Sequence, residues 1–321
     1  MTKYATPDTP APTPGDSESA GDPPDNRFPQ GFSVRRMTRL LQVSASGYYA
    51  YVRRATLLAQ AVLTPRQQRR ADLTVKVLDV HSESKGVYGS PRITAELRDR
   101  GEKVNEKTIA SIMAQVGIEG ISPRTFKVRT TVVDPTASFP PDRVRRQFDQ
   151  GRLDAVWMTD ITYLTCGEGD MFLCAIRDGH SRRVLGHVVA DHFGGEMVCQ
   201  AIDGAVASRK QDGREVAGTI LHSDRGGEFT ASTTAQACDR HDLKRSMGET
   251  GVCWDNAGAE SFWSTFKHEY YYRHTFATKA ELVAAVDNWI DWFNTERRHS
   301  AVGMLSPIRY EQSLTGTAKA A

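Results

Sequence analysis

Apolar residues recur every three or four positions in the first part of the chain, which is the spacing of amphipathic helices. From Phe32 to about Leu63 this spacing predicts two short helices separated by a turn at Ser46-Gly47. From about 66 to 117 it predicts a long helix followed by two shorter ones. Ser90 is expected to cap the first of the shorter helices and Asn105 the second, because both residue types accept hydrogen bonds from free helix N–H groups.

From 151 the pattern changes to the alternation that is typical of strands. The segments "AVWMTDITYLTC", "MFLCAIRDGHS" and "RRVLGHVVADHF" predict three strands in a meander. A helix, the strand "GTILHSD", a helix to about His241 and the strand "LKRSM" follow, and then helices over about 257–270 and 278–297. This order predicts an α/β fold in which a mixed five-stranded sheet is flanked by helices, preceded by an all-α helix-turn-helix region.

The net charge of +2 conceals an uneven distribution. Residues 1–26 carry −4 (1 basic against 5 acidic), residues 27–150 carry +11 (22 against 11) and residues 151–321 carry −5 (18 against 23). A strongly basic region is typical of a surface that neutralises nucleic-acid phosphates, although many basic segments are only solvated. In this context the helix-turn-helix pattern favours contact with DNA, with a plain helical hairpin as the alternative.

Composition and pattern together predict six segments. Residues 1–26 are rich in Pro, Ser, Gly and acidic residues and are expected to form a disordered tail. The others are a small helical unit at 27–64, a helix-turn-helix DNA-binding region at 65–122, a basic linker at 123–150, an α/β core at 151–275, and a C-terminal helix and tail at 276–321.

No segment is apolar over the roughly 18 residues that a membrane span needs. The N-terminus lacks the apolar region of a secretion signal. The five cysteines, at 166, 174, 199, 238 and 253, are scattered without the paired spacing of zinc ligands. The sequence therefore predicts a cytoplasmic protein with no membrane partner and no disulfide framework.

Three carboxylates stand where a cation site would need them. Asp160 lies within the apolar strand "WMTDITYL", where an unpaired charge is costly. Asp224 follows the buried strand "TILHSD", and Glu260 lies in the helix after "WDNAGA". Each alone has an ordinary interpretation as a cap, a surface acid or a hydrogen-bonded core group. Together they offer only oxygen ligands, which Mg²⁺ prefers, and two such ions support phosphoryl transfer. Lys267 lies two helical turns after Glu260 on the same face, within reach of DNA phosphate.

These segments resemble the signatures of DDE transposases and retroviral-type integrases. "WMTDITYL", "HSDRGGEF" and "WDNAGAESFWSTFKHEY" are similar to the three motifs, 35 residues separate Asp224 from Glu260 as in that superfamily, and Lys267 is at its usual basic position. "SGYYAY" and "YGSPRIT" resemble the N-terminal helical region of the OrfB-type transposases of bacterial insertion sequences. "FNTERRHSAVGMLSPIRYE" resembles their C-terminal signature.

The resemblance implies an RNase H-like integrase catalytic core at 151–275. It implies that Asp160, Asp224 and Glu260 are catalytic and hold two Mg²⁺ ions, for which Mn²⁺ would substitute. The implied reaction is Mg-dependent cleavage at the element end to free a 3′-OH, followed by attack of that hydroxyl on target DNA; both steps are in-line phosphoryl transfers. Candidate DNA-binding residues are Lys267, Arg92, Lys107, Arg124, Arg297 and Arg298.

The expected partners follow from the same resemblance. They are double-stranded DNA, at the terminal inverted repeats and at the target, and further copies of the chain in a homo-oligomer on that DNA. An OrfA-like product of an upstream frame is expected as a fusion or a partner. Two rival functions stay open. A DNA-binding protein without catalysis is disfavoured by the three carboxylates, and a plain RNase H-like nuclease would leave the helix-turn-helix region superfluous.

Some positions have no settled role at this point. The segment "GGEF" after Asp224 departs from the form usual in insertion-sequence transposases, and Arg225 and Glu228 have no assigned chemistry. His222 is expected to be a neutral structural histidine bonded to backbone rather than part of the metal site. Trp263 and Phe266 are expected in the core. Arg297, Arg298 and His299 either contact DNA or brace the core.

Overall fold

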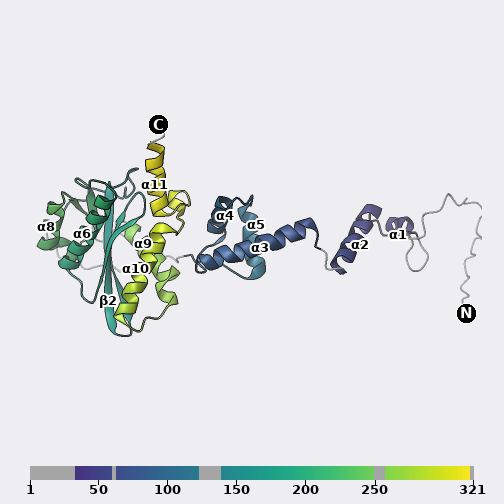
Figure 1. Ribbon diagram of the computed structural model, residues 1–321, viewed down its shortest axis with the longest axis horizontal. Helices are drawn as coiled ribbons and strands as arrows, with labels where there is room; N and C mark the ends of the chain where they lie inside the picture. The colour runs from purple at the N-terminus through teal and green to yellow at the C-terminus, as the bar shows by residue number, and fades with distance from the viewer. Residues whose placement is uncertain (1–32, 60–62, 123–138, 249–256, 319–321) are drawn as a thin grey trace, which may run out of the picture. The chain divides into compact units, whose positions relative to one another are not determined.

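The computed structural model describes residues 33–59, 63–122, 139–248 and 257–318 (Figure 1). The chain divides into two units, Met1–Leu73 and Thr74–Ala321. The expected tail at 1–26 and the linker residues 123–138 lie outside the described ranges. Within these ranges every helix is too short or too polar to span a lipid bilayer.

The first unit contains the two short helices expected from the sequence, α1 (Val34–Leu40) and α2 (Ala45–Ala59). The turn between them is not at Ser46-Gly47, as predicted, because α2 already begins at Ala45. The Ser44 hydroxyl accepts a hydrogen bond from the Gly47 N–H at 3.0 Å, so this side chain satisfies a free donor of the first turn. Glycine here lies inside the start of a helix.

The helix-turn-helix region consists of α3 (Pro65–Glu83), α4 (Ser90–Asp99) and α5 (Glu106–Val116); α3 begins in the first unit and ends in the second. Asn105 caps α5 as expected, since its side chain accepts the Lys107 N–H at 2.8 Å. Ser90 does not cap α4; it is the first helical residue, and Gly89 takes the cap position without a side-chain hydrogen bond. Apolar residues of α4 and α5 are buried: Ile93, Leu97, Ile109, Ile112 and Met113.

A mixed sheet of five strands forms the centre of the second unit. Its strands are β1 (Val156–Cys166), β2 (Gly169–Asp178), β3 (Val184–Ala190), β4 (Ile220–Ser223) and β5 (Lys244–Met247). The spatial order is β3-β2-β1-β4-β5. The first three strands pair antiparallel, as the predicted meander requires, and β4 and β5 join parallel to β1. The predicted fold class is therefore confirmed.

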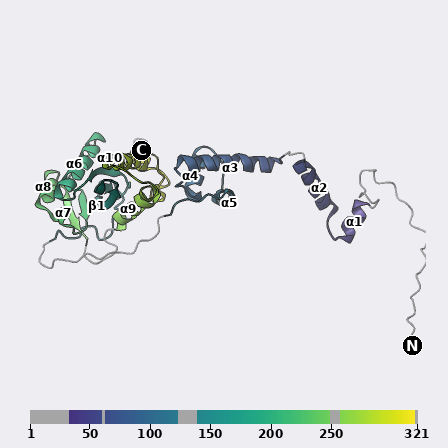
Figure 2. The same ribbon diagram turned by 90° about the horizontal axis from the view of Figure 1, so that it is seen from below.

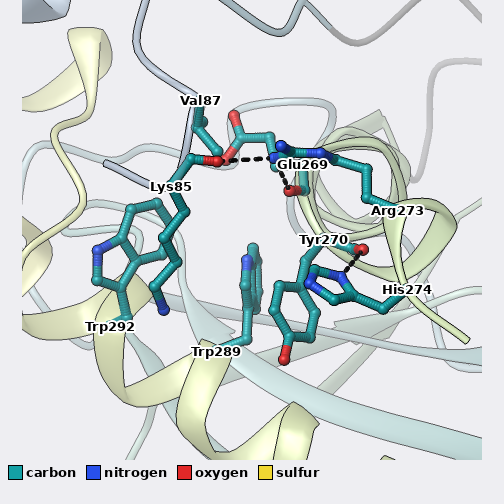
Figure 3. A pocket seen from close by; sticks show the side chains of 8 residues that line it. All are labelled: Lys85, Val87, Glu269, Tyr270, Arg273, His274, Trp289 and Trp292. Carbon is teal, nitrogen blue, oxygen red and sulfur yellow. Dashed lines mark hydrogen bonds between the residues drawn. The ribbon is translucent and has the colours of Figure 1, made fainter. Parts of the chain in front are cut away.

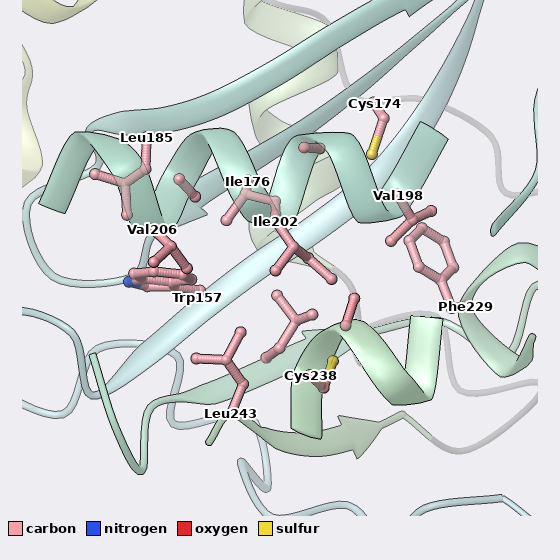
Figure 4. Packing of buried hydrophobic residues seen from close by; sticks show 14 of the residues in the cluster. Trp157, Cys174, Ile176, Leu185, Val198, Ile202, Val206, Phe229, Cys238 and Leu243 are labelled. Atoms are coloured by element: carbon pink, nitrogen blue, oxygen red, sulfur yellow. The ribbon is translucent and has the colours of Figure 1, made fainter. Parts of the chain in front are cut away.

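Helices cover both faces of this sheet. They are α6 (Gly195–Gln211), α7 (Gly227–Thr230), α8 (Ser232–Arg240), α9 (Ala257–Glu269), α10 (Lys279–Thr295) and α11 (Pro307–Ala318), with short 3-10 turns at Tyr271–Arg273 and Ser300–Val302. Figures 1 and 2 show α6 and α8 on one face and α9 and α10 on the other. The main core lies under α6 and α8, where Trp157, Ile202 and Phe229 interlock (Figure 4).

The C-terminal helix α11, which the sequence pattern does not resolve from its tail, is tied to the sheet by ion pairs. Arg209 of α6 is fully buried and donates to both carboxylate oxygens of Glu311, at 2.8 and 2.9 Å. The same guanidinium donates to Asp154 at 2.6 Å and to Asp178 at 3.3 Å. One buried cation therefore links α6, the start of β1, the end of β2 and α11.

The described end of the predicted linker packs on the sheet. Val144 is buried, and the Arg143 N–H donates to the Ser246 hydroxyl of β5 at 2.9 Å. Residues 139–150 thus contact the core directly. The six-segment division as a whole stays a prediction.

Candidate active site

Asp160 lies in the middle of β1, opposite Ala175 of β2. Its side chain is half-buried and accepts two hydrogen bonds, from the Ile161 N–H at 2.9 Å and from the Trp263 indole Nε1 at 3.1 Å. Burial raises the pKa of Asp160 to about 7, and the negative charge of Asp224 raises it further, against the two hydrogen bonds. A carboxyl placed here is strongly penalised when it is ionised without a cation.

Asp224 comes to the same place because of strand register. Met158 of β1 and His222 of β4 are partners in a parallel pair, and Asp160 and Asp224 each lie two residues further along. Side chains two positions apart in extended chain point to the same side, so the register brings the two carboxylates together. Asp224 is exposed, and its Oδ1 accepts the Gly226 N–H at 3.0 Å.

Glu260 is in the first turn of α9, and its charge also raises the pKa of Asp160. Partial burial raises the pKa of Glu260 itself. The start of α9 is held by Arg177 of β2, which donates from Nη2 to the Gly258 carbonyl at 2.5 Å and lies 5.2 Å from the centroid of the Phe262 ring. Burial lowers the pKa of Arg177 to about 9, because little around it compensates the loss of water.

Lys267 lies further along α9 and is half-buried. Burial lowers the pKa of Lys267, while the charge of Asp160 opposes this change. This electrostatic interaction places the lysine on the side of the helix that faces the carboxylates, as its spacing from Glu260 predicts.

Glu228 is a fourth carboxylate of the site that the sequence left without a role. Burial raises its pKa, and the charge of Asp224 adds to the rise. A Cβ at Gly226 would lie 2.6 Å from Oε1 of Glu228 and 3.1 Å from Oδ1 of Asp224, so only glycine fits between them. Arg225 braces this loop instead of facing the carboxylates: its Nε donates to the Gly248 carbonyl at 2.9 Å, and its guanidinium stacks on Phe139 at 4.6 Å.

His222 and Trp263 take positions that only the structure could give them. The His222 ring is buried, lies 3.0 Å from the Ser246 hydroxyl and packs edge-on against Phe148. This environment fits a structural histidine. Trp263 is buried as expected of a core residue, but it also donates to Asp160.

The candidate DNA-binding residues are distributed differently from one another. Lys107 is exposed in the first turn of α5, and Arg124 lies outside the described residues. Arg297 is buried and donates to Glu269 at 2.5 and 2.6 Å, and Arg92 approaches the same carboxylate at 3.4 Å.

Arg298 is buried too, with Glu96 and Asp99 of α4 at 2.7 and 2.6 Å. The Arg298 N–H donates to the Tyr88 hydroxyl at 2.8 Å. The "YGSPRIT" and "ERRHS" segments therefore bind each other. For Arg297 and Arg298 these contacts support the bracing alternative, and DNA contact by them stays a prediction.

The carboxylates are chemically suited to Mg²⁺. Among the described residues, no group of three or more His, Cys, Asp and Glu side chains lies close enough to hold one metal ion. Mg²⁺, however, commonly takes one or two carboxylates and completes its shell with water and substrate phosphate. Asp160, Asp224 and Glu260 supply oxygen only, and their mutual repulsion is what a bound cation would relieve.

Comparison with known proteins agrees with this geometry. Two models described as an integrase core domain match residues 152–253 and 241–307, and a model of an HTH-like domain matches residues 67–126. The chain is 34% identical over 283 residues to the transposase InsF for insertion sequence IS3A of Escherichia coli (strain K12), which covers 87% of this chain and 94% of that protein. The chain belongs to the transposases of bacterial insertion sequences.

Solved structures with a similar arrangement are retroviral. The catalytic core domain of BIV integrase is 17% identical and covers 51% of this transposase and 99% of that chain, with a TM-score of 0.36. The HTLV-2 integrase catalytic core domain in complex with magnesium is 13% identical and covers 49% and 95%, with a TM-score of 0.38.

Proposed function

We propose that this transposase cleaves the ends of its insertion sequence and joins them to target DNA in two Mg²⁺-dependent phosphoryl transfers. In the first, a water oxygen bonds to phosphorus and the bond to the 3′-oxygen of the element breaks, which leaves a 3′-OH. In the second, that 3′-oxygen bonds to a target phosphorus and displaces a target 3′-hydroxyl. The number of phosphodiester bonds is unchanged in the second step, so no external energy source is needed.

The alignment of Asp160 with Asp224 by strand register is the observation that supports this proposal most. Two Mg²⁺ ions held by these residues and Glu260 would activate the attacking oxygen and stabilise the leaving one. The burial of Asp160 keeps its carboxylate in a region of weak solvent screening, and the Trp263 hydrogen bond fixes its direction. Lys267 supplies a positive charge for a DNA phosphate on the same side of α9.

The helix-turn-helix region is proposed to recognise double-stranded DNA at the terminal repeats. Exposed Lys107 at the start of α5 and Arg124 after it are the residues assigned to phosphate contact. We further propose that the transposase acts in the bacterial cytoplasm as a homo-oligomer on DNA, because two element ends have to be joined together. Whether an OrfA-like product joins it is testable by co-purification from the host.

The three carboxylates distinguish this function from a DNA-binding role without catalysis. Asp160→Asn, Asp224→Asn and Glu260→Gln are each expected to lower Mg²⁺-dependent cleavage of a duplex carrying the element terminus by at least about 10³-fold. Binding of that duplex, measured without metal, is expected to be unchanged. Asp239→Asn, at an exposed position of α8, is the matched control. Normal cleavage by the three variants would show that the metal assignment is wrong.

A separate measurement tests DNA recognition. Lys107→Ala and Arg124→Ala are expected to weaken duplex binding and to reduce its dependence on salt by about one phosphate contact each. Lys244→Ala, at an exposed lysine of β5, is the control. An unchanged salt dependence for both variants would remove these residues from the interface.

A further inference from the structure

A pocket of about 160 Å³ lies between the segment after α3 and the helices α9 and α10, away from the carboxylates of the active site (Figure 3). Two buried tryptophans of α10, Trp289 and Trp292, form its aromatic wall, and Tyr270 stands beside them. Its rim carries the exposed side chains of Lys85 and Arg273. The pocket therefore combines flat apolar surfaces with a basic entrance.

The Trp289 indole brings an unused hydrogen-bond donor to this pocket. The residue is 1% exposed, and its Nε1 has no hydrogen-bond partner among the residues that the structure describes. A buried donor without a partner is uncommon and costs free energy. The ring is held by Phe266 and Phe293, with centroids at 4.9 and 5.0 Å, so it is not free to turn towards water. An acceptor supplied from outside would satisfy it.

The basic rim is itself organised. The Lys85 Nζ lies 5.3 Å from the centroid of the Trp292 ring. Arg273 donates to the backbone carbonyls of Lys85 and Glu269, at 3.0 and 3.2 Å, and so joins the two sides of the entrance (Figure 3). The carboxylate of Glu269, which also lines the pocket, is paired with Arg297. The lysine ammonium is thus the charge available to an anionic ligand at the entrance.

We propose that this pocket binds one unpaired nucleotide, with the base against the tryptophans and the phosphate at Lys85. Cavities of about 150 Å³ hold a single six-membered ring, so the space suits one base ring. Every base carries ring nitrogen or carbonyl acceptors for the Trp289 N–H. Aromatic surfaces next to lysine or arginine are the usual means of holding single-stranded nucleic acid. The assignment of DNA as the source of this nucleotide rests on the proposed function.

Binding is measured without metal, so that the outcome does not depend on catalysis. The probe is a fluorescein-labelled single-stranded 12-mer in EDTA, with its duplex form alongside, bound to the full chain. Trp289→Phe, which removes only the donor and part of the ring, and Lys85→Ala are expected to weaken single-strand binding about three- to tenfold. Duplex binding is expected to change less than about twofold, and Lys244→Ala is expected to leave both unchanged. Wild-type affinity of both pocket variants for the single strand would overturn the proposal.

A second measurement locates the base even if a variant folds poorly. A 12-mer with one 5-iododeoxyuridine, irradiated on the wild-type chain, is expected to crosslink within Lys279–Thr295. A crosslink confined to other segments would overturn the proposal.

Competition by thymidine monophosphate separates the two sources of the nucleotide. Displacement of the crosslink by the monophosphate identifies a free nucleotide as a ligand. Crosslinking that resists the monophosphate and is displaced by unlabelled single strand identifies an unpaired nucleotide within DNA. If the pocket variants bind weakly while Asp224→Asn binds normally, the pocket stands even when the proposed cleavage reaction does not.

Discussion

The indole Nε1 of Trp263 donates a hydrogen bond to Oδ2 of Asp160 at 3.1 Å. This contact joins the helix that carries Glu260 to the strand that carries Asp160. A core tryptophan thereby also orients a carboxylate of the active site. Because burial and neighbouring charges raise the pKa of Asp160 to about 7, the ionised form of this residue depends on such support.

Asp160→Asn is expected to stabilise the metal-free transposase at pH 8. The folded-state pKa of about 7 lies above the ordinary value of 3.8, so the folded state binds the proton more tightly than the unfolded state. Stability contributed by that proton is complete below pH 4 and is lost as the pH rises towards 7. The variant should gain about 1–3 kcal/mol in free energy of unfolding at pH 8, measured by urea denaturation in EDTA, and less at pH 5. Asp239→Asn serves as control, and an equal gain at both pH values would contradict the prediction.

Trp263→Phe is expected to have the opposite effect at pH 8. Phenylalanine keeps the contact with Phe262 but removes the donor to Asp160. A hydrogen bond to the charged form lowers the carboxyl pKa, so its contribution is present when Asp160 is ionised and weakens as the pH falls through 7. The expected loss is about 1–3 kcal/mol at pH 8 and smaller at pH 5. A loss that does not vary with pH would indicate packing alone.

Gly258→Ala is expected to impair cleavage without removing any carboxylate. A Cβ at Gly258 would lie 2.3 Å from the Met158 sulfur, so α9 would have to move away from β1 and carry Glu260 with it. Gly204→Ala in α6 is the matched control, since a Cβ there meets nothing closer than 3.8 Å and alanine favours helix by about 0.5–1 kcal/mol. Cleavage by Gly258→Ala should fall at least about tenfold. Equal cleavage by the two alanine variants would show that α9 tolerates the shift.

The sequence predicted the strands, their order of appearance and the three carboxylates, because these depend on local periodicity and on a recognisable spacing. It could not supply the register that aligns Asp160 with Asp224. It also missed Glu228, whose place is set by a loop conformation that glycine permits. The helix start at Ala45 was misplaced because a Ser-Gly pair usually indicates a turn, whereas here Ser44 acts as a cap.

Arg297 and Arg298 show most clearly what sequence cannot decide. A pair of arginines near the end of a DNA-binding chain is equally compatible with phosphate contact and with a buried ion pair. Their partners come from distant segments: Glu269 lies 28 residues from Arg297, and Glu96 lies 202 residues from Arg298. Only the folded chain brings these charges together.

The Arg297–Glu269 pair is expected to behave as a buried unit. Arg297→Met should lower the free energy of unfolding by about 3–5 kcal/mol, because it leaves the carboxylate of Glu269 without its bidentate partner in the interior. Glu269→Gln should cost a similar amount. The double variant should lose clearly less than the sum, and this non-additivity, measured by urea denaturation, distinguishes a coupled pair from two independent defects. Arg100→Ala, which breaks surface pairs with Glu83 and Glu96, should cost less than about 1 kcal/mol.

Arg209 is expected to decide whether α11 stays attached. Its guanidinium has no exposed surface and serves Asp154, Asp178 and Glu311 together, so Arg209→Met would leave three buried carboxylates with too few cations. The expected loss is at least about 3–5 kcal/mol, together with faster proteolysis between Val302 and Pro307.

Glu311→Gln removes only the contact with α11 and should therefore speed that cleavage with a smaller loss of global stability. The matched control is Arg240→Met, because its pair with Asp203 is exposed. If Arg209→Met unfolds at lower urea while α11 remains as resistant to protease as in the wild type, the buried cluster stabilises the sheet but does not hold the C-terminal helix.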